Sequence, residues 1–254
     1  MNILVSNDDG VESPGILNLA ETLGSLGPVT VVAPHRERST SGHSLTLHKP
    51  LRMKEVRKNH FAISGTPADC VYMATRFVMK NKPDVIVSGI NKGANLGNDI
   101  YYSGTVAAAR EGSYWGVKSF AVSLCPGPDD GDKLYWDTAS HFAKLIVEAA
   151  WTENYPVHTV ININVPNLPL AKIKGLRLSQ QGRRFYTDEI TDRVDPRHKH
   201  YYWLGGEYKG FENIPGSDCV NVDQGFVSIT PLKIDSTDYD HLGEFKKWEK
   251  QIQF

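Results

Sequence analysis

Cysteine is scarce in this 254-residue chain, and neither a disulfide framework nor a zinc motif is present. The three cysteines, Cys70, Cys125 and Cys219, are odd in number and widely spaced, which predicts ordinary reduced thiols. The chain also lacks a basic and apolar leader and any run of 18 apolar residues, so we expect a cytoplasmic protein without membrane segments. Its 28 basic and 29 acidic residues give a net charge of −1, which argues against long nucleic acids as partners.

The first half of the chain alternates strand and helix patterns. Apolar, β-branched runs predict strands, and apolar residues at helical spacing predict helices between them. The predicted strands are 3–6, 29–33, 84–88, 119–124 and 159–165, and the predicted helices are 14–26, 66–79, 105–115 and 137–151. Alternation with almost continuously apolar strands is typical of a parallel sheet. We therefore expect an α/β fold, a Rossmann-like and mostly parallel sheet with helices on both faces.

The second half of the chain follows a different pattern. Short strand signals at 177–179, 201–204 and 226–230 are separated by long polar stretches, and 242–252 has the pattern of a helix. Long polar connections are typical of functional arms or subunit contacts. We expect a catalytic core over residues 1–175, then an extended β arm over 176–254, with a returning strand and a C-terminal helix that serve oligomerisation.

The most informative motif is Asn7-Asp8-Asp9-Gly10, directly after the first predicted strand. Two adjacent carboxylates repel and raise each other's pKa unless a positive charge lies between them. A hard cation such as Mg²⁺ or Mn²⁺ meets that need, because it prefers oxygen ligands. Asp and Gly are also common turn formers, so the motif by itself fits a turn as well as a metal site.

Two other predicted strands end in polar residues that carry oxygen. Ser39 follows the second strand, and Asn91 follows the strand 84–88. Ligands of open parallel sheets bind beyond the carboxyl ends of the strands, where these residues would meet Asp8 and Asp9. Each taken alone fits a turn or a helix cap, but together the oxygen donors suit Mg²⁺ or Mn²⁺ and not zinc.

A glycine-rich stretch, 89–99, precedes Ser103-Gly104-Thr105 at the start of a predicted helix. Free N–H groups and hydroxyls at a helix N-terminus form an anion site, although the same residues also make a plain N-cap. The chain has neither a Walker loop nor a Gly-x-Gly-x-x-Gly motif that opens a helix. A phosphate group is therefore a better-supported ligand than ATP or NAD.

Taken in order, several motifs resemble those of the stationary-phase survival protein SurE family of nucleotidases. They are Asn7-Asp8-Asp9-Gly10, Ala33-Pro34 to Arg38-Ser39, Gly65 to Cys70, Val87 to Asn91, Ser103 to Val106, Asn162 to Pro166 and Gly225 to Pro231. The resemblance implies a metal-dependent phosphatase that acts on nucleoside 5′- and often 3′-monophosphates, and in part on short-chain polyphosphate. It places one divalent cation, Mg²⁺ or Mn²⁺, on Asp8, Asp9, Ser39 and Asn91. It also implies a homodimer or homotetramer formed by exchange of the C-terminal segment.

The expected chemistry assigns a role to each of the remaining candidates. Asp8 or Asp9 would orient or deprotonate the attacking water, in addition to binding the cation. The group Asn95, Ser103, Gly104 and Thr105 would hold the phosphate and stabilise the charge on its oxygens. His43 would protonate the leaving alkoxide, although it also fits simple packing in a loop.

Other classes of protein explain the motifs less well. A receiver domain has an acidic pair and binds Mg²⁺, but it needs a phospho-acceptor Asp after a later strand and about half this length. A haloacid-dehalogenase-type phosphatase needs Asp-x-Asp, whereas Asp8 and Asp9 are adjacent. A non-catalytic sensor that binds a metal and a nucleotide is the alternative function. The preferred base and the order of the phosphate substrates stay open.

Overall fold

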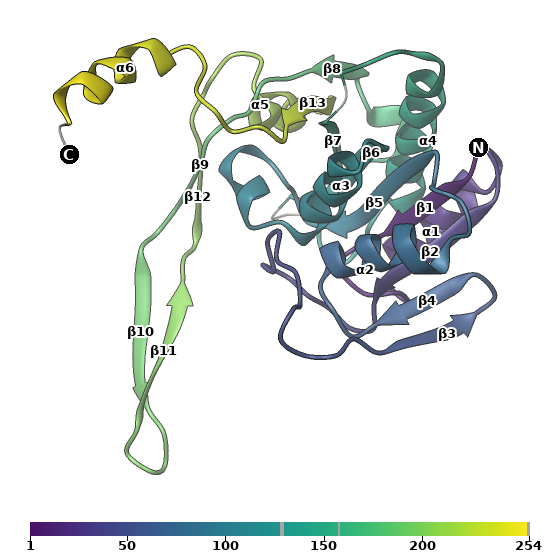
Figure 1. The fold of residues 1–254 in the computed structure, drawn as a ribbon, viewed down its shortest axis with the longest axis horizontal. Coiled ribbons are helices and arrows are strands. Elements are labelled where there is room, and N and C mark those ends of the chain that lie inside the picture. The colour runs from purple at the N-terminus through teal and green to yellow at the C-terminus, as the bar shows by residue number, and fades with distance from the viewer. Residues whose placement is uncertain (128–129, 157, 253–254) are drawn as a thin grey trace.

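The computed structural model describes residues 1–127, 130–156 and 158–252. Figure 1 shows a layered body of sheet and helices, from which a long hairpin and a C-terminal helix project on one side. No helix in the described part of the chain is both long and apolar enough to cross a membrane.

Among the described residues, nine strands form one central sheet in the order β3-β4-β2-β1-β5-β6-β7-β13-β8. The strands are β1 (Ile3–Ser6), β2 (Val29–Pro34), β3 (Met53–Arg57), β4 (His60–Ile63), β5 (Val85–Lys92), β6 (Lys118–Cys125), β7 (Thr159–Pro166), β8 (Leu176–Leu178) and β13 (Val227–Lys233). The central run from β4 to β7 is parallel, while β3 pairs antiparallel with β4 and β13 pairs antiparallel with β7. The prediction of a mostly parallel sheet is confirmed.

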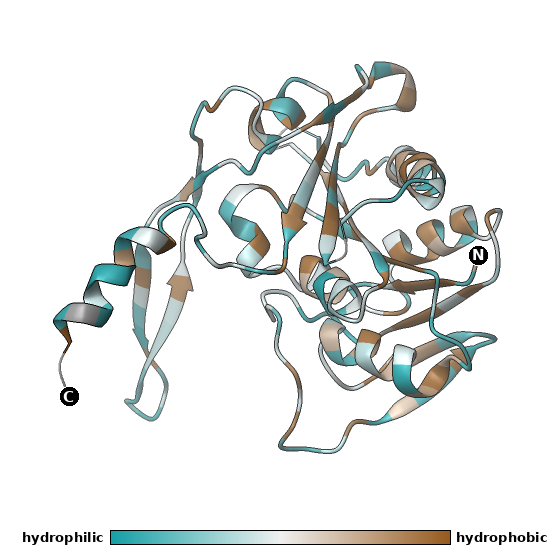
Figure 2. Cartoon of the chain, turned by 45° about the horizontal axis from the view of Figure 1, so that its top comes forward, coloured by the Kyte–Doolittle hydropathy of each residue, from teal (hydrophilic) through white to brown (hydrophobic). Residues whose placement is uncertain are grey.

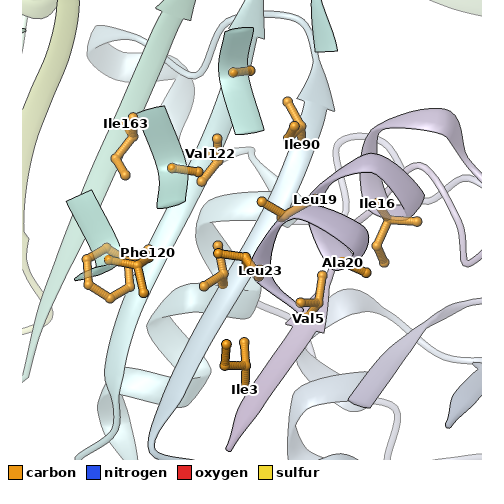
Figure 3. Packing of buried hydrophobic residues seen from close by; sticks show 14 of the residues in the cluster. Ile3, Val5, Ile16, Leu19, Ala20, Leu23, Ile90, Phe120, Val122 and Ile163 are labelled. Atoms are coloured by element: carbon orange, nitrogen blue, oxygen red, sulfur yellow. The ribbon is translucent and has the colours of Figure 1, made fainter. Parts of the chain in front are cut away.

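Helices cover both faces of this sheet because successive strand residues point to opposite sides. The helices are α1 (Pro14–Leu23), α2 (Pro67–Met73), α3 (Gly104–Tyr114) and α4 (Trp136–Thr152). Ile3 and Val5 of β1 belong to the core cluster that contains α1 and α4, and Leu4 belongs to the cluster that contains α2 and α3. Figure 3 shows the first cluster, with Leu19 and Leu23 of α1 above the strands.

The ends of two helices follow from their sequences. Thr66 caps α2 in a capping box, in which its hydroxyl accepts the Asp69 N–H and the Asp69 carboxylate accepts the Thr66 N–H. The single helix predicted over 66–79 is instead α2 followed by a π-helical turn, η1 (Ala74–Val78). There the Thr75 hydroxyl donates to the carbonyls of Val71 and Tyr72, which disturbs the regular hydrogen-bond ladder.

The second half of the chain adds two strands to the central sheet and also forms elements that project from it. β8 and β13 join the central sheet, with the short helix α5 (Asp218–Asp223) between them in sequence. Between β8 and α5, a long two-part hairpin projects, made of β9 (Arg184–Tyr186), β10 (Glu189–Val194), β11 (His200–Gly205) and β12 (Tyr208–Phe211). The terminal helix α6 (Leu242–Gln251) lies apart from the body (Figure 1).

Apolar side chains stay exposed on both projecting elements. Trp203 and Leu204 are exposed on the hairpin, and Phe245 and Trp248 are exposed on α6. Figure 2 shows hydrophobic residues on these elements as well as in the body. Surfaces of this kind are typical of protein–protein contacts.

Candidate active site

The turn after β1 is built by Asn7 rather than by the acidic pair. Its side-chain amide donates to the Gly10 carbonyl at 3.0 Å and to the Ser13 hydroxyl at 2.8 Å, and its amide oxygen accepts the Gly10 N–H at 3.2 Å. Because Asn7 closes the turn, the carboxylates of Asp8 and Asp9 are not needed for it. The same motif can therefore form a turn through Asn7 and offer Asp8 and Asp9 to a cation.

Asp8 is buried against the start of α3, with 6% of its surface exposed. Its carboxylate accepts a hydrogen bond from the Thr105 hydroxyl, and its backbone carbonyl accepts the Arg38 N–H at 2.7 Å. A Cβ atom added to Gly104 would lie 2.7 Å from the Asp8 Cβ, so only glycine fits at this first position of α3. The close packing of α3 therefore fixes the Asp8 carboxylate.

Both acidic side chains carry raised pKa values. Burial raises the pKa of Asp8, and hydrogen bonds from Thr105 oppose that rise in part. Burial and then the charge of Asp8 raise the pKa of Asp9 to about 6, while the Lys92 N–H, which donates to Asp9 at 3.3 Å, opposes it. Asp8 is buried and Asp9 is half-buried, and both accept hydrogen bonds from neutral donors, an arrangement that suits a divalent cation.

The cavity at this edge of the sheet has a volume of about 380 Å³. Ten side chains line it, and they come from strand ends, from the glycine-rich stretch and from the base of the hairpin. They are Asp8, Ser39, Thr40, Asn91, Asn95, Asn98, Asp99, Tyr102, Ser103 and Tyr186. Three of the four predicted cation ligands thus share one cavity, and Asp9 is the direct neighbour of Asp8.

A β-bulge at the end of β5 gives Asn91 its position. The pairing of β5 with β6 shifts register between Ser88 and Asn91, and such bulges re-aim side chains. Gly89 within the bulge has φ of 141°, and a Cβ there would lie 2.3 Å from the Val122 carbonyl oxygen. The Asn91 amide nitrogen donates to the Gly93 carbonyl at 2.8 Å, so its oxygen is the group suited to a cation.

The donor set fits a hard cation. It comprises two carboxylates, the Ser39 hydroxyl and the Asn91 amide oxygen, which are the ligand types that Mg²⁺ and Mn²⁺ prefer. Within residues 1–127, 130–156 and 158–252, no group of three or more His, Cys, Asp or Glu side chains is arranged to hold a metal ion. A cation here would therefore rely on two acids, neutral oxygens and retained water.

The predicted phosphate contacts divide into two groups. Asn95 and Ser103 line the cavity, whereas Gly104 and Thr105 lie against Asp8. The Ser103 hydroxyl accepts the Val106 N–H at 3.0 Å, so its role as an N-cap is confirmed.

Asn95 is held by side chains that sequence reasoning did not assign. Its backbone carbonyl accepts the amides of Asn162 and Asn164 on β7, at 2.9 and 3.0 Å, and its own amide donates to the Ser123 hydroxyl at 2.8 Å. The Asn162-Ile-Asn164 motif thus fixes the glycine-rich loop from beneath. The polar side chains within an otherwise apolar strand were the available signal.

His43 lies elsewhere, alongside α3. Its Nε2 atom is 2.8 Å from a carboxylate oxygen of Glu111, and the other Glu111 oxygen accepts the Trp115 indole N–H at 2.8 Å. Glu111 is two helical turns along α3 from the residues at the cavity. The structure therefore brings the acidic pair, Ser39, Asn91 and Asn95 together, and it places His43 on a separate pair with Glu111.

Fold and site together define a class: a Rossmann-like α/β protein with an acidic, oxygen-lined cavity at the carboxyl edge of its sheet. Residues 3–188 match the family described as "Survival protein SurE". The protein named 5′-nucleotidase SurE of Geobacter metallireducens is 47% identical over 249 residues, which cover 98% of each chain. The one of Geotalea uraniireducens is 45% identical over 249 residues, covering 98% of this chain and 99% of that protein.

The crystal structure of the SurE protein from Aquifex aeolicus has the same fold. It superimposes with a TM-score of 0.85 at 40% sequence identity, and the match covers 98% of this chain and 100% of that chain. This chain therefore belongs to the SurE family, and the α/β fold expected from its sequence is confirmed.

Proposed function

We propose that this protein is a metal-dependent phosphatase that hydrolyses nucleoside 5′-monophosphates, and also 3′-monophosphates and short-chain polyphosphate. The observation that carries the proposal is the acidic pair, buried Asp8 and half-buried Asp9, at a cavity that Asp8, Ser39 and Asn91 line. The name 5′-nucleotidase SurE, carried by relatives that match along nearly the whole chain, supports the same activity.

Asp8, Asp9, Ser39 and Asn91 would hold one divalent cation, Mg²⁺ or Mn²⁺. When bound, that cation neutralises phosphate charge and activates water for attack. Of the two carboxylates, Asp9 is better suited to orient the water and take its proton, since the Asp8 carboxylate is engaged by Thr105.

The phosphate would lie between the acidic pair and Asn95. The Asn95 side chain is fixed from β6, so its position costs no reorganisation when charge develops on the phosphate oxygens. The N-terminal end of α3, which starts beside Asp8, adds a favourable electrostatic field for an anion. The role of His43 as proton donor to the leaving alkoxide stays a prediction from the sequence: its Nε2 atom faces Glu111, and His43 is not among the residues that line the cavity.

The exposed apolar residues of the hairpin and α6 support a homodimer or homotetramer formed by exchange of these segments. Nucleoside monophosphates are the proposed ligands, and the cytoplasm is the proposed location. The near-zero net charge gives no support to a long nucleic acid as a partner.

The direct test measures phosphate release from a panel of nucleoside 5′- and 3′-monophosphates after chelation and after readdition of Mg²⁺ or Mn²⁺. We expect release only when the metal is restored. A folded protein that binds nucleotide but releases no phosphate with any metal would contradict the proposal and favour the sensor alternative.

A further inference from the structure

Two tyrosines, Tyr102 and Tyr186, line the cavity in addition to its polar side chains; these two rings define its aromatic end, and Asp8 with its neighbour Asp9 defines its acidic end. Tyr102 follows the 3₁₀ helix η2 (Gly97–Tyr101), and Tyr186 is the last residue of β9 at the base of the hairpin. Tyr102 is 67% exposed and Tyr186 is 42% exposed. Rings this open to solvent at a cavity contribute little to the core, so their packing alone does not account for them.

Tyr186 is held in place by a polar cluster. Its hydroxyl donates to Asp99 at 2.6 Å, and the Arg184 guanidinium pairs with the same carboxylate. The Arg184 N–H donates to the Asn98 side chain at 2.7 Å, which attaches the hairpin base to η2. On its other side, the Tyr186 ring contacts Tyr208, with ring centres 5.7 Å apart.

Tyr102 is positioned by its backbone. Its N–H donates to the Asp99 carbonyl at 3.0 Å, and its carbonyl accepts the Gly42 N–H at 3.2 Å. Gly42 belongs to the loop that also carries Ser39, so both ends of the cavity are connected through this loop. The Tyr186 side chain and the Tyr102 backbone are therefore held in the wall that also contains Asp8.

We propose that Tyr186, together with Tyr102, binds the nucleobase of the substrate by stacking, and that the Asp99–Arg184 pair positions Tyr186 for this contact. The inference rests on the proposed function: a nucleotide whose phosphate lies beside Asp8 has its nucleoside in the same cavity that the two tyrosines line. A cavity of about 380 Å³ falls in the range of small-molecule sites. Every base has an aromatic face, so stacking favours nucleotides in general over phosphate esters without a base.

The test compares AMP with ribose 5-phosphate, which has the same phosphate and sugar but no base. In Tyr186→Ala we expect the kcat/KM ratio of AMP to ribose 5-phosphate to fall about tenfold, mostly through KM, because the stacking contact is lost. Tyr186→Phe keeps the ring but loses the hydroxyl bond to Asp99, so it should restore the ratio only in part. Tyr101→Ala is the matched control, since this exposed neighbouring tyrosine lines a different cavity with Arg110.

A binding measurement separates this inference from the proposed function. Calorimetry in the presence of Mg²⁺, with a non-hydrolysable phosphonate analogue of AMP, should show about tenfold weaker binding for Tyr186→Ala, with the matching analogue of ribose 5-phosphate as the reference. If AMP is hydrolysed but Tyr186→Ala changes neither the kcat/KM ratio nor the relative binding of the two ligands, the inference is wrong while the function stands. If hydrolysis fails but binding still depends on the ring, the inference holds and the function is wrong. An equal loss for both ligands would show that Tyr186 only shapes the hairpin base, and it would also overturn the inference.

Discussion

At the acidic end of the cavity, Asp8 and Asp9 are adjacent and are held by neutral donors, whereas at the aromatic end Asp99 is paired with Arg184. Burial alone would lower the pKa of Arg184, and the Asp99 carboxylate with Tyr186 and Tyr208 raises it net. The aromatic end thus contains its own counter-charge, whereas the acidic end would take its counter-charge from the proposed cation. The difference supports the proposal that chemistry takes place at the acidic end and recognition at the aromatic end.

The largest expected effect is at the acidic end. Asp8→Asn and Asp9→Asn each keep the side-chain volume but remove a negative charge from the cation site. We expect kcat/KM to fall by at least about 10²–10³-fold, the scale for losing one electrostatic contact in an active site. The loss should be the same for AMP and ribose 5-phosphate, unlike that of Tyr186→Ala.

Circular dichroism of these two variants serves as the folding control. Full activity in either variant would show that the mutated carboxylate is not needed for catalysis. The assignment of the chemistry to the acidic end would then be wrong.

His43 tests whether the chemistry extends beyond the cavity. A general acid contributes about 10²–10⁴-fold, so His43→Gln should lower kcat for AMP by at least about 10²-fold. The same variant should hydrolyse p-nitrophenyl phosphate nearly as well as the native chain, because that leaving group needs no proton.

Glu111→Gln should reproduce the His43→Gln pattern more weakly, since Glu111 orients the ring. Equal losses on AMP and p-nitrophenyl phosphate, or no loss on either, would contradict the role of His43 as an acid. His43 would then be a loop residue that only packs against α3.

Gly104 shows how closely the acidic end depends on helix packing. In Gly104→Ala the new methyl group would lie 2.7 Å from the Asp8 Cβ and 3.0 Å from the Ser41 hydroxyl, so one of them must move. We expect about 1–3 kcal/mol of lost stability. We also expect about 10- to 100-fold lower activity, because small displacements of catalytic groups are costly.

Gly243→Ala in α6 is the control, because a Cβ there meets nothing within 4 Å. Denaturant unfolding and kcat/KM measured on both variants check the prediction. A fully active Gly104→Ala would show that Asp8 tolerates displacement.

The acidic end was far more accessible to sequence reasoning than the aromatic end. Asp8 and Ser39 follow strands and Asn91 lies near the end of β5, and a parallel sheet brings such strand ends to one edge. Tyr186 reaches the cavity through Asp99, 87 residues earlier in the chain, and no local pattern encodes such a contact. Asn95 is likewise held by Asn164, 69 residues away.

The fold shows the same division between local and long-range information. The parallel strands β1, β2, β5, β6 and β7 were predictable from their apolar runs, whereas β4 and the edge strand β3 were missed. The charged residues of β3, including Lys54 and Glu55, are exposed at the sheet edge and hide the apolar alternation. The π-helical turn after α2 was also missed, because it depends on one hydroxyl, that of Thr75, within a helical pattern.

The smallest expected effect is the pH dependence of stability in the metal-free chain. The pKa of Asp9 is about 6 in the folded state and 3.8 in its ordinary state. Between these values the folded state binds more protons than the unfolded state, so the free energy of unfolding decreases as pH rises from about 4 to 6. The contribution of this carboxyl is therefore destabilising above pH 6 and disappears toward pH 4.

In a chelator, Asp9→Asn should accordingly melt at a higher temperature than the native chain at pH 7.5, and the difference should shrink toward pH 4.5. Adding Mn²⁺ should raise the melting temperature of the native chain at pH 7.5 and do so less at pH 5, because protons then compete for Asp9. The Asp99–Arg184 pair supplies the internal comparison, since its charge is already compensated within the fold. The native chain and Asp9→Asn could instead show the same pH dependence of the melting temperature. The Asp9 carboxylate would then not destabilise the metal-free fold, and the two ends of the cavity would not differ in the way inferred from their contacts.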